Sequence, residues 1–346
     1  MSKTLQDYAT LINDTIQSNE INHYITTDNM CQNLGGIDTF KNINIPQGKV
    51  RSFQKDDVLL SNIRLYFRKV YRAKQKGGCS SDVLVFRAKH IDSATLFAIL
   101  SSQIFTDYAC SGSQGSKMPR GNKTHMMDFK IPTINFTIAK IFNSIQNKIE
   151  NNHKINELLH TIAYKIYEYY FKYKPKNAKL EQIIIENPKS SIMVKNAQKT
   201  QDKYPFFTSG DNILFYPKAI IDGRNCFLNT GGNAGIKFYV GKASYSTDTW
   251  CICANEFSDY LYLLLSSIKT HINQSFFQGT SLKHLQKNLL KKYPIYMPSA
   301  HEIKKFNQII MPLLTLISIN TRTSKKLEQI RDFLLPLLLK QQVKPQ

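Results

Sequence analysis

A run of thirteen residues, Arg64 to Lys76, combines six cations and three aromatic rings with no acidic side chain. Cations neutralise phosphates and aromatic rings stack on bases, so this mixture is typical of a nucleic-acid interface. The alternative interpretation is a strand with a solvated basic face. The candidate contacts in this run are Arg64, Tyr66, Arg68, Lys69 and Arg72.

A Gln-Gly phrase occurs twice, as "SQGSKMPR" at 113–120 and within "FFQGTSLKHL" at 276–285. Glycine permits a sharp turn, and the hydroxyl of Ser116, Thr280 or Ser281 can cap a short helix, which is a purely structural interpretation. Cations beside exposed helix-start amides would instead form a phosphate site. The candidate ligand contacts beside the phrases are Lys117, Arg120, Asn122, Lys123 and Lys283.

The chain aligns with itself. Gln114 and Gly115 meet Gln278 and Gly279 at an offset of 164, and flanking segments align at offsets up to 168. Each half has the same order: a strand-rich segment, a short helix, the Gln-Gly phrase and a long helix. A period near half the chain predicts a duplicated domain with an internal pseudo-two-fold repeat.

Two long helices are predicted, over 137–172 and 301–340, from apolar residues spaced three or four apart. At about 1.5 Å per residue, each is roughly 50–60 Å long, so the two are expected to pair as an antiparallel coiled coil. The predicted seam consists of Ile141, Ile145, Ile149, Leu159, Ile162, Ile166, Phe306, Ile310, Leu313, Ile317, Leu327 and Leu334.

The predicted fold class is therefore α+β, with two similar strand-rich α/β domains separated by two long antiparallel coiled-coil helices. The expected divisions are a first strand-rich domain at 1–134, a central helical region at 135–188, a second strand-rich domain at 189–299 and a C-terminal helical region at 300–346. The segment 1–134 holds 17 cations and 11 anions, and 189–299 holds 13 and 6. Each domain is separately basic, as two binding heads would be.

The second head has its own candidate contacts, which do not copy the first. The candidate nucleic-acid contacts are Arg224, Asn233, Lys237, Tyr239 and Lys242. Arginine suits guanine edges and asparagine suits adenine, so divergent surfaces on a shared scaffold predict different sequence preferences. The segment Thr230–Gly235 resembles a phosphate cradle, but without the Lys-Ser/Thr ending a strand-connecting turn is the favoured interpretation.

The bulk composition favours a polyanionic partner. The formal net charge is +21, from 46 Lys+Arg and 25 Asp+Glu; the alternative is a solvated basic surface. The six cysteines lack zinc-site spacing, which predicts reduced thiols, and neither a secretion signal nor a membrane span is recognisable, so a cytoplasmic protein is expected.

A search for catalytic motifs finds none. HExxH, Gly-x-Ser-x-Gly, P-loop and amino-methylating tetrapeptide patterns are all missing, and no histidine has ligand spacing. We therefore expect no catalytic residue, no metal and no cofactor bound by this chain. Two alternatives stay open: a methyltransferase or nuclease with an unrecognised active site, and a structural coiled-coil adaptor.

In their order along the chain, several phrases resemble the DNA-specificity subunits of type I restriction–modification systems. They are "YITTDNM" (24–30), "DVLLSNIRLYFRKV" (57–70), "CSSDVLVF" (79–86), "YPFFTSG" (204–210), "LNTGGNAGIKFYVGKASYSTDTW" (228–250), "FFQGTSLKHL" and the helical phrase "LEQIRDFLLPLLL" (327–339). The resemblance covers essentially the whole chain. It departs from the family pattern at the junction 131–135, which lacks a Gln and a second Pro.

The resemblance implies two target-recognition domains, each reading one half of a split site in double-stranded DNA. It implies that the long helices set the gap between the halves and dock two methyltransferase subunits, with motor-nuclease subunits as further partners. Those methyltransferases would bind S-adenosylmethionine and methylate adenine at N6, so this chain would be a non-catalytic subunit in phage defence.

Overall fold

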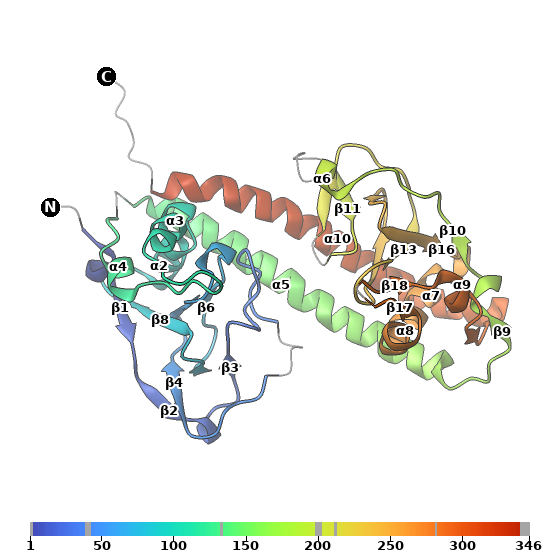
Figure 1. The fold of residues 1–346 in the computed structure, drawn as a ribbon, viewed down its shortest axis with the longest axis horizontal. Helices are drawn as coiled ribbons and strands as arrows, with labels where there is room; N and C mark the ends of the chain where they lie inside the picture. The colour runs from blue at the N-terminus through green and yellow to red at the C-terminus, as the bar shows by residue number, and fades with distance from the viewer. Residues whose placement is uncertain are drawn as a thin grey trace. The chain divides into compact units, whose positions relative to one another are not determined.

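The computed structural model describes residues 3–38, 43–131, 134–197, 203–210, 213–280 and 282–339 (Figure 1). Packing of the backbone divides the chain into two units. Unit 1 comprises Met1–Asn151 with Lys325–Gln346, and unit 2 comprises Asn152–Ser324. Each unit therefore contains one strand-rich part and portions of both long helices, and each is described by itself below.

Unit 1 is built on a four-stranded antiparallel sheet in the order β1-β8-β5-β6. The strands are β1 (Ala9–Ile12), β8 (Val83–Ala88), β5 (Val58–Ser61) and β6 (Val70–Arg72). Helices α2 (Ser93–Leu100) and α3 (Gln103–Ser111) contribute to the core on this sheet. Both helices begin at a capping side chain: Asp92 accepts the Thr95 amide and Ser102 accepts the Phe105 amide, which satisfies amides that a helix start leaves unpaired.

A second sheet in unit 1 has the order β2-β4-β7-β3. Its strands are β2 (Thr15–Gln17), β4 (Lys49–Phe53), β7 (Gly77–Cys79) and β3 (Tyr24–Ile25). The pair β3–β7 is parallel and the other two pairs are antiparallel. Phe53, Cys79 and Ile25 join strand residues of the first sheet in a small separate core, so the two sheets stabilise one another.

Unit 2 contains a four-stranded sheet in the order β10-β16-β13-β14. Its strands are β10 (Ile185–Glu186), β16 (Thr249–Cys253), β13 (Arg224–Asn229) and β14 (Ile236–Val240). Helix α7 (Ser258–Ser267) contributes eight buried residues and joins the sheet in the unit's main core, and α8 (Lys269–Ser275) follows it. A three-stranded sheet has the order β12-β11-β15, from β12 (Leu214–Tyr216), β11 (Tyr204–Phe207) and β15 (Ser244–Tyr245).

The sheets β1-β8-β5-β6 and β10-β16-β13-β14 correspond strand by strand, and the second sheets of the two units share one parallel pair. In β1-β8-β5-β6 and in β10-β16-β13-β14, the strand before the short helices lies between the N-terminal edge strand and the strand that starts a hairpin. In the second sheet of each unit a parallel pair recurs, Ile25 with Cys79 in unit 1 and Phe207 with Tyr245 in unit 2. Cys79 and Tyr245 are 166 positions apart, within the offsets of the sequence alignment. The correspondence supports the predicted repeat, and the four-segment division of the chain stays a prediction.

The long helices are α5 (Phe136–Tyr167), which continues as a π-helical turn over Glu168–Lys172, and α10 (Ala300–Leu338) (Figure 1). Their bounds confirm the helices predicted over 137–172 and 301–340 to within two residues. In unit 1, Phe142 of α5 shares a core with Leu335 of α10, and in unit 2, Tyr167 shares a core with Phe306. Burial of one face in each unit, rather than intrinsic propensity, stabilises helices of this length.

The buried face of α5 is rotated from the predicted apolar stripe. Ile141 and Ile162 are predicted seam positions, but their side chains are 43% and 49% exposed. Ile149, Phe306, Ile310 and Ile317 are buried as expected, and the other predicted seam positions are half-buried, namely Ile145, Leu159, Ile166, Leu313, Leu327 and Leu334. The face of α5 that is buried instead carries Ala139, Phe142, Gln146, Ile149, Asn152, Ala163 and Tyr167.

Polar side chains occupy part of that buried face because they pair with one another. In unit 2, the amide of Asn152 donates to the hydroxyl of Ser324 over 3.1 Å, and Asn320 donates to Asn156 over 3.0 Å. Asn156 also donates to the hydroxyl of Thr321 over 3.3 Å. Such polar layers cost some stability and fix the register of packed helices. The buried face is therefore set partly by hydrogen bonds between asparagine, serine and threonine side chains, which the spacing of apolar residues cannot predict.

Candidate nucleic-acid interface

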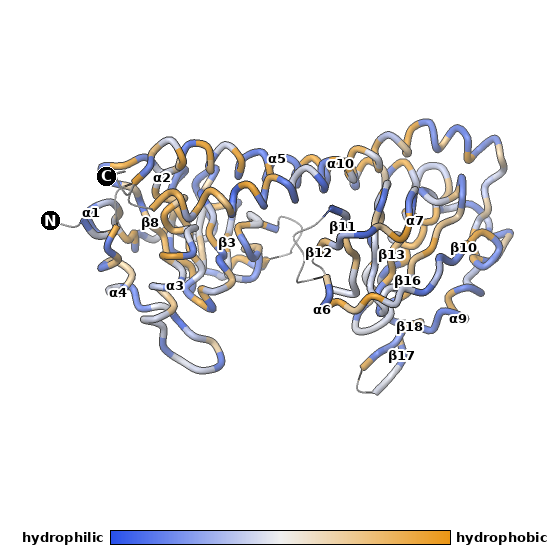
Figure 2. The backbone as a smooth tube through the Cα atoms, turned by 90° about the horizontal axis from the view of Figure 1, so that it is seen from above, coloured by the Kyte–Doolittle hydropathy of each residue, from blue (hydrophilic) through white to orange (hydrophobic). Residues whose placement is uncertain are grey.

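The two Gln-Gly phrases form the same backbone feature. Gln114 and Arg120 exchange backbone hydrogen bonds of 2.9 and 2.8 Å, and Gln278 pairs in the same way with His284 across β17 (Phe277–Gln278) and β18 (His284–Leu285). Gly115 has a φ of +99° and Gly279 of +141°, which lie in the region that favours glycine. Each phrase thus opens a short loop, and in Figure 2 both loops extend away from the body of their own unit.

Each of these loops is hydrogen-bonded to the turn that follows a central sheet strand. In unit 1 the amide of Arg64 donates to the carbonyl of Pro119 over 2.9 Å, and in unit 2 the amide of Gly232 donates to the carbonyl of Lys283 over 2.9 Å. We define the loop pair of unit 1 as residues 62–69 with 113–123, and the loop pair of unit 2 as 230–235 with 278–284, where Ser281 lies outside the described residues. The repeat therefore places two loops together in each unit.

The predicted helix cap is not formed by the hydroxyl of the first phrase. Ser116 is exposed inside the loop, and the next helix, α4 (Lys123–Met127), begins later. Its cap is Asn122, whose side chain accepts the amide of His125 over 3.1 Å. Cations, rather than helix-start amides, therefore remain the candidate anion contacts of this loop.

The loop pair of unit 1 presents several cations to solvent. Lys117, Arg120 and Lys123 are exposed, as is the ring of Tyr66. Arg120 forms an ion pair of 3.0 Å with Asp82, which holds the base of the loop while its side chain stays mostly in solvent. Arg64 is half-buried and donates to the carbonyl of Lys117 over 3.4 Å. The arrangement can contact phosphates and place one aromatic ring beside them.

The loop pair of unit 2 is less charged. Lys283 and Asn233 are exposed, and the carbonyl of Asn233 accepts the side-chain amide of Asn229 over 3.2 Å. Lys242, also exposed, lines a separate hollow of about 470 Å³ together with Lys218. One cation and one amide at the loop pair can contact a phosphate and a base edge.

The phosphate-cradle interpretation of Thr230–Gly235 is excluded by what its amides do. Gly232 donates to Lys283, and the amide of Ala234 donates to the side chain of Asn273 over 2.8 Å. The segment leads from β13 directly into β14, so it is the strand-connecting turn that the sequence favours. The amide of Gly232 thus holds the neighbouring loop, and the amide of Ala234 joins the segment to α8.

Three candidate contacts of unit 1 have structural roles. Arg68 donates to the carbonyl of Ser101 over 3.0 Å and lies 3.9 Å from a carboxylate oxygen of Asp332, while burial lowers its pKa. The ammonium of Lys69 donates to the carbonyl of Thr27 over 2.5 Å. Arg72 is half-buried and lies 3.9 Å from Asp56. These interactions engage all three cationic groups within the protein, and their role as DNA contacts stays a prediction.

Three candidates of unit 2 are likewise engaged within the protein. Arg224 binds the carboxylate of Asp259 through two nitrogens and donates to the hydroxyl of Thr315 over 3.0 Å, so it joins β13 to α7 and α10. Burial raises the pKa of Asp259, and the hydrogen bonds from Arg224 oppose that rise. Tyr239 is buried in an aromatic core, and burial raises its pKa.

Lys237, two residues before Tyr239, is the third of these candidates and donates to the carbonyl of Thr208 over 2.8 Å. Both faces of β14 are packed, because Tyr239 is buried in one core and Phe238 packs against the other, so strand alternation gives no signal for Lys237 or Tyr239.

Two exposed side chains at the interface escaped the sequence interpretation because they are apolar. Met118 and Leu282 are 54% and 57% exposed, beside Lys117 and Lys283 respectively. They are 164 residues apart, which is the offset of the Gln-Gly phrase itself. The self-alignment, followed residue by residue through the loop, is the signal that would have identified them.

Within the described ranges, no three His, Cys, Asp or Glu side chains are grouped as a metal ion requires. No helix in the same ranges is long and apolar enough to cross a membrane.

Comparison with known proteins relates this geometry to a family. Residues 176–329 match the family model of the type I restriction modification DNA specificity domain. The S subunit of a type I restriction-modification system from M. genitalium has a similar structure, with a TM-score of 0.65 at 14% identity over 99% of this chain and 96% of that chain. The HsdS subunit from Thermoanaerobacter tengcongensis gives a TM-score of 0.37 at 13% identity, over 98% of this chain and 96% of that chain. Comparison with curated proteins gives no match.

Proposed function

We propose, because residues 176–329 match the family model of the type I restriction modification DNA specificity domain, that the chain is a DNA-specificity subunit and reads a split DNA site, one half through each unit. The observation that carries the proposal is the repeated loop pair, which in both units holds at least one exposed Lys or Arg beside an exposed apolar side chain. Cations supply sequence-independent affinity for phosphates, and the remaining side chains contact base edges. A net charge of +21 supports a polyanionic partner.

Different residues at equivalent loops support different half-sites. Unit 1 presents Arg120 and Tyr66, whereas unit 2 presents Asn233 and Lys283. Arginine pairs with the two acceptors of guanine and asparagine with the donor and acceptor of adenine. The two halves of the proposed site therefore differ in sequence, and the site is asymmetric.

We further propose that the long helices dock methyltransferase subunits. On the described part of the helices, apolar side chains remain exposed in both units, which single soluble chains rarely tolerate in contiguous patches. In unit 2 a hollow of about 340 Å³ is lined by Ile162, Ile166, Tyr169 and Ile309. In unit 1 Ile141, Ile330 and Phe333 are exposed on the same two helices. One such surface in each unit supports two docked subunits.

The proposed partners supply the chemistry that this chain lacks. They bind S-adenosylmethionine and methylate adenine at N6, while this chain selects the site and the helices set the gap between its halves. Motor-nuclease subunits join the same complex when DNA is cleaved. Catalysis by this chain itself is the competing proposal, together with a purely structural adaptor.

We expect the purified chain to retard duplex DNA but to transfer no methyl group from S-adenosylmethionine, and to confer site-selective methylation when a methyltransferase subunit encoded beside it is added. Labelled methyl incorporation into DNA measures the result. Transfer by the single chain would show it to be an enzyme, and a chain that neither retards DNA nor changes the partner's sites would be an adaptor. The partner without this chain is the control.

A further inference from the structure

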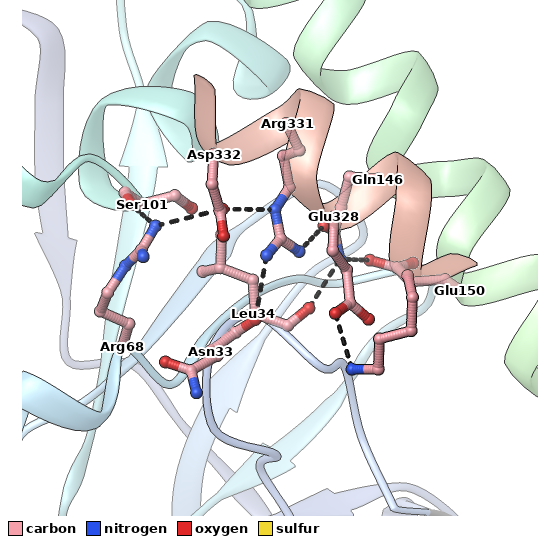
Figure 3. A network of polar contacts seen from close by, with 10 residues as sticks. Asn33, Leu34, Arg68, Ser101, Gln146, Glu150, Glu328, Arg331 and Asp332 are labelled. Atoms are coloured by element: carbon pink, nitrogen blue, oxygen red, sulfur yellow. Dashed lines mark hydrogen bonds and ion pairs between the residues drawn. The ribbon is translucent and has the colours of Figure 1, made fainter. Parts of the chain in front are cut away.

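Arg331 of α10 is a fully buried cation in unit 1, with 2% of its surface exposed. Its guanidinium lies at the centre of the polar network in Figure 3. One terminal nitrogen donates to the side-chain oxygen of Gln146 on α5 over 2.9 Å, and the other faces the carbonyl of Asn33 over 3.4 Å. Nε donates to Asp332 over 3.0 Å. A buried charge persists only when its nitrogens are satisfied in this way.

The turn that Arg331 holds is backbone that needs support. Asn33 and Leu34 have φ values of +52° and +61°, a conformation that side-chain-bearing residues rarely adopt. The carbonyl of Asn33 is bound by Arg331, and the carbonyl of Leu34 accepts the side-chain amide of Gln146 over 2.8 Å. The two helices thus fix both carbonyl groups of a strained turn, as surroundings must where such strain persists.

The same turn holds the DNA-facing loop of unit 1. The amide of Asn33 donates to the carbonyl of Phe67 over 2.9 Å, and the amide of Leu34 donates to the carbonyl of Arg68 over 3.1 Å. These two acceptors lie near the end of the loop segment 62–69, which also contains Arg64 and Tyr66. A continuous path of hydrogen bonds therefore joins the C-terminal helix to the first loop of the pair.

A second path runs through Asp332. Its carboxylate accepts from Arg331 and lies 3.9 Å from Arg68, whose own backbone has a φ of +49°. Arg68 also donates to the carbonyl of Ser101, at the end of α2. Side chains on α10 thus reach the segment 62–69 both through the turn at Asn33 and directly through Arg68 (Figure 3).

We infer that Arg331 is a positioning residue for DNA recognition by unit 1, acting through the Asn33–Leu34 turn on the loop that carries Arg64 and Tyr66. The inference rests on the proposed function for its effect on DNA and on contacts within unit 1 for its mechanism. Lysine cannot replace arginine fully here, because one ammonium cannot match the fork that spans Gln146 and Asn33.

The first test needs no DNA. Hydrogen exchange of the segment 62–69 is compared among the wild-type chain, Arg331→Met, the milder Arg331→Lys and Lys326→Met, which removes an exposed cation from the same helix. We expect faster exchange in 62–69 for Arg331→Met, an intermediate rate for Arg331→Lys and no change for Lys326→Met. Unchanged exchange in both folded Arg331 variants overturns the inference, whether or not the chain binds DNA.

The second test uses the complete methyltransferase complex and duplexes in which one half-site at a time is scrambled. We expect Arg331→Met to reduce discrimination at the half-site of unit 1 by about tenfold, the scale of one base contact, with the half-site of unit 2 unaffected. Arg331→Lys should restore part of the loss. Equal losses at both half-sites mean general destabilisation and overturn the positioning role. If the wild-type complex does not discriminate against scrambling of either half-site, the proposed function is wrong. The hydrogen-exchange experiment still tests, independently of DNA, whether Arg331 stabilises the segment 62–69.

Discussion

Replacing Arg224 by methionine is expected to lower the free energy of unfolding by about 3–5 kcal/mol, the cost of leaving a buried charge without its partner. Asp259 is almost fully buried, and Arg224 supplies two hydrogen bonds to its carboxylate. Methionine keeps an apolar stem of similar length, so the loss reports the ion pair more than a cavity. Chemical denaturation of the full chain at neutral pH measures the difference.

The loss depends on pH in a defined direction. Burial already raises the pKa of Asp259 in the folded chain, and removing Arg224 removes the hydrogen bonds that oppose this rise. A carboxyl with a higher pKa in the folded state than in the unfolded state loses stability as the pH rises above its unfolded value, which is about 3.9. The deficit of Arg224→Met should therefore be smallest near the acidic end of the folded range and grow toward neutral pH.

The control is Lys242→Met, which removes an exposed cation from the turn after β14. Surface changes of this kind usually alter stability by no more than about 0.5 kcal/mol. If Arg224→Met costs no more than Lys242→Met, or if its deficit is the same across pH, the assignment of Arg224 to a structural ion pair is wrong.

Replacing Lys117, Arg120 and Lys123 together by glutamine should weaken binding of this chain to all duplex DNA. Removing one phosphate contact lowers the slope of log affinity against log salt by about 0.9, so the slope of the triple variant should be smaller by roughly 3. All three side chains are exposed on the loop pair of unit 1, and glutamine preserves their polarity. Gel retardation between about 50 and 200 mM salt resolves a change of that size.

The matched control replaces Lys49, Lys55 and Lys76, which are exposed cations of unit 1 outside the loop pair. It removes the same formal charge, so it separates a local contact from the general attraction of a basic protein. An identical salt slope for the two triple variants would remove the loop pair from the DNA interface.

The spacing of apolar residues located the long helices because each helix buries one face over many turns. The periodicity remains recognisable even where single apolar residues are exposed or single polar residues are buried. The spacing did not predict which side of α5 is buried, because residue hydrophobicity places Ile141 in the core and Gln146 in solvent. Gln146 is buried because Arg331 and Leu34 satisfy its amide. Those partners lie 185 and 112 residues away in sequence, beyond any local pattern.

The candidate interface was also predicted only in part, because the partners of several of its residues are distant in sequence. The Gln-Gly phrase and its cations follow from the repeat, which the sequence displays directly. Arg68 and Arg224 look like their exposed neighbours in the sequence, and only the tertiary positions of Asp332 and Asp259 distinguish a structural arginine from a DNA contact. The sequence gives the charge of an arginine, whereas its role depends on which carboxylates and carbonyl groups lie next to it in the folded chain.

The most direct test of two independent reading heads exchanges residues 189–299 for the equivalent segment of a relative with a different specificity. The chimeric chain replaces the native one in the source cell, and methylated bases are mapped across the genome. We predict that one half-site changes to that of the relative, while the other half-site and the gap stay as they were. A chimera that folds and methylates, but whose half-sites both change or both stay the same, would contradict the account.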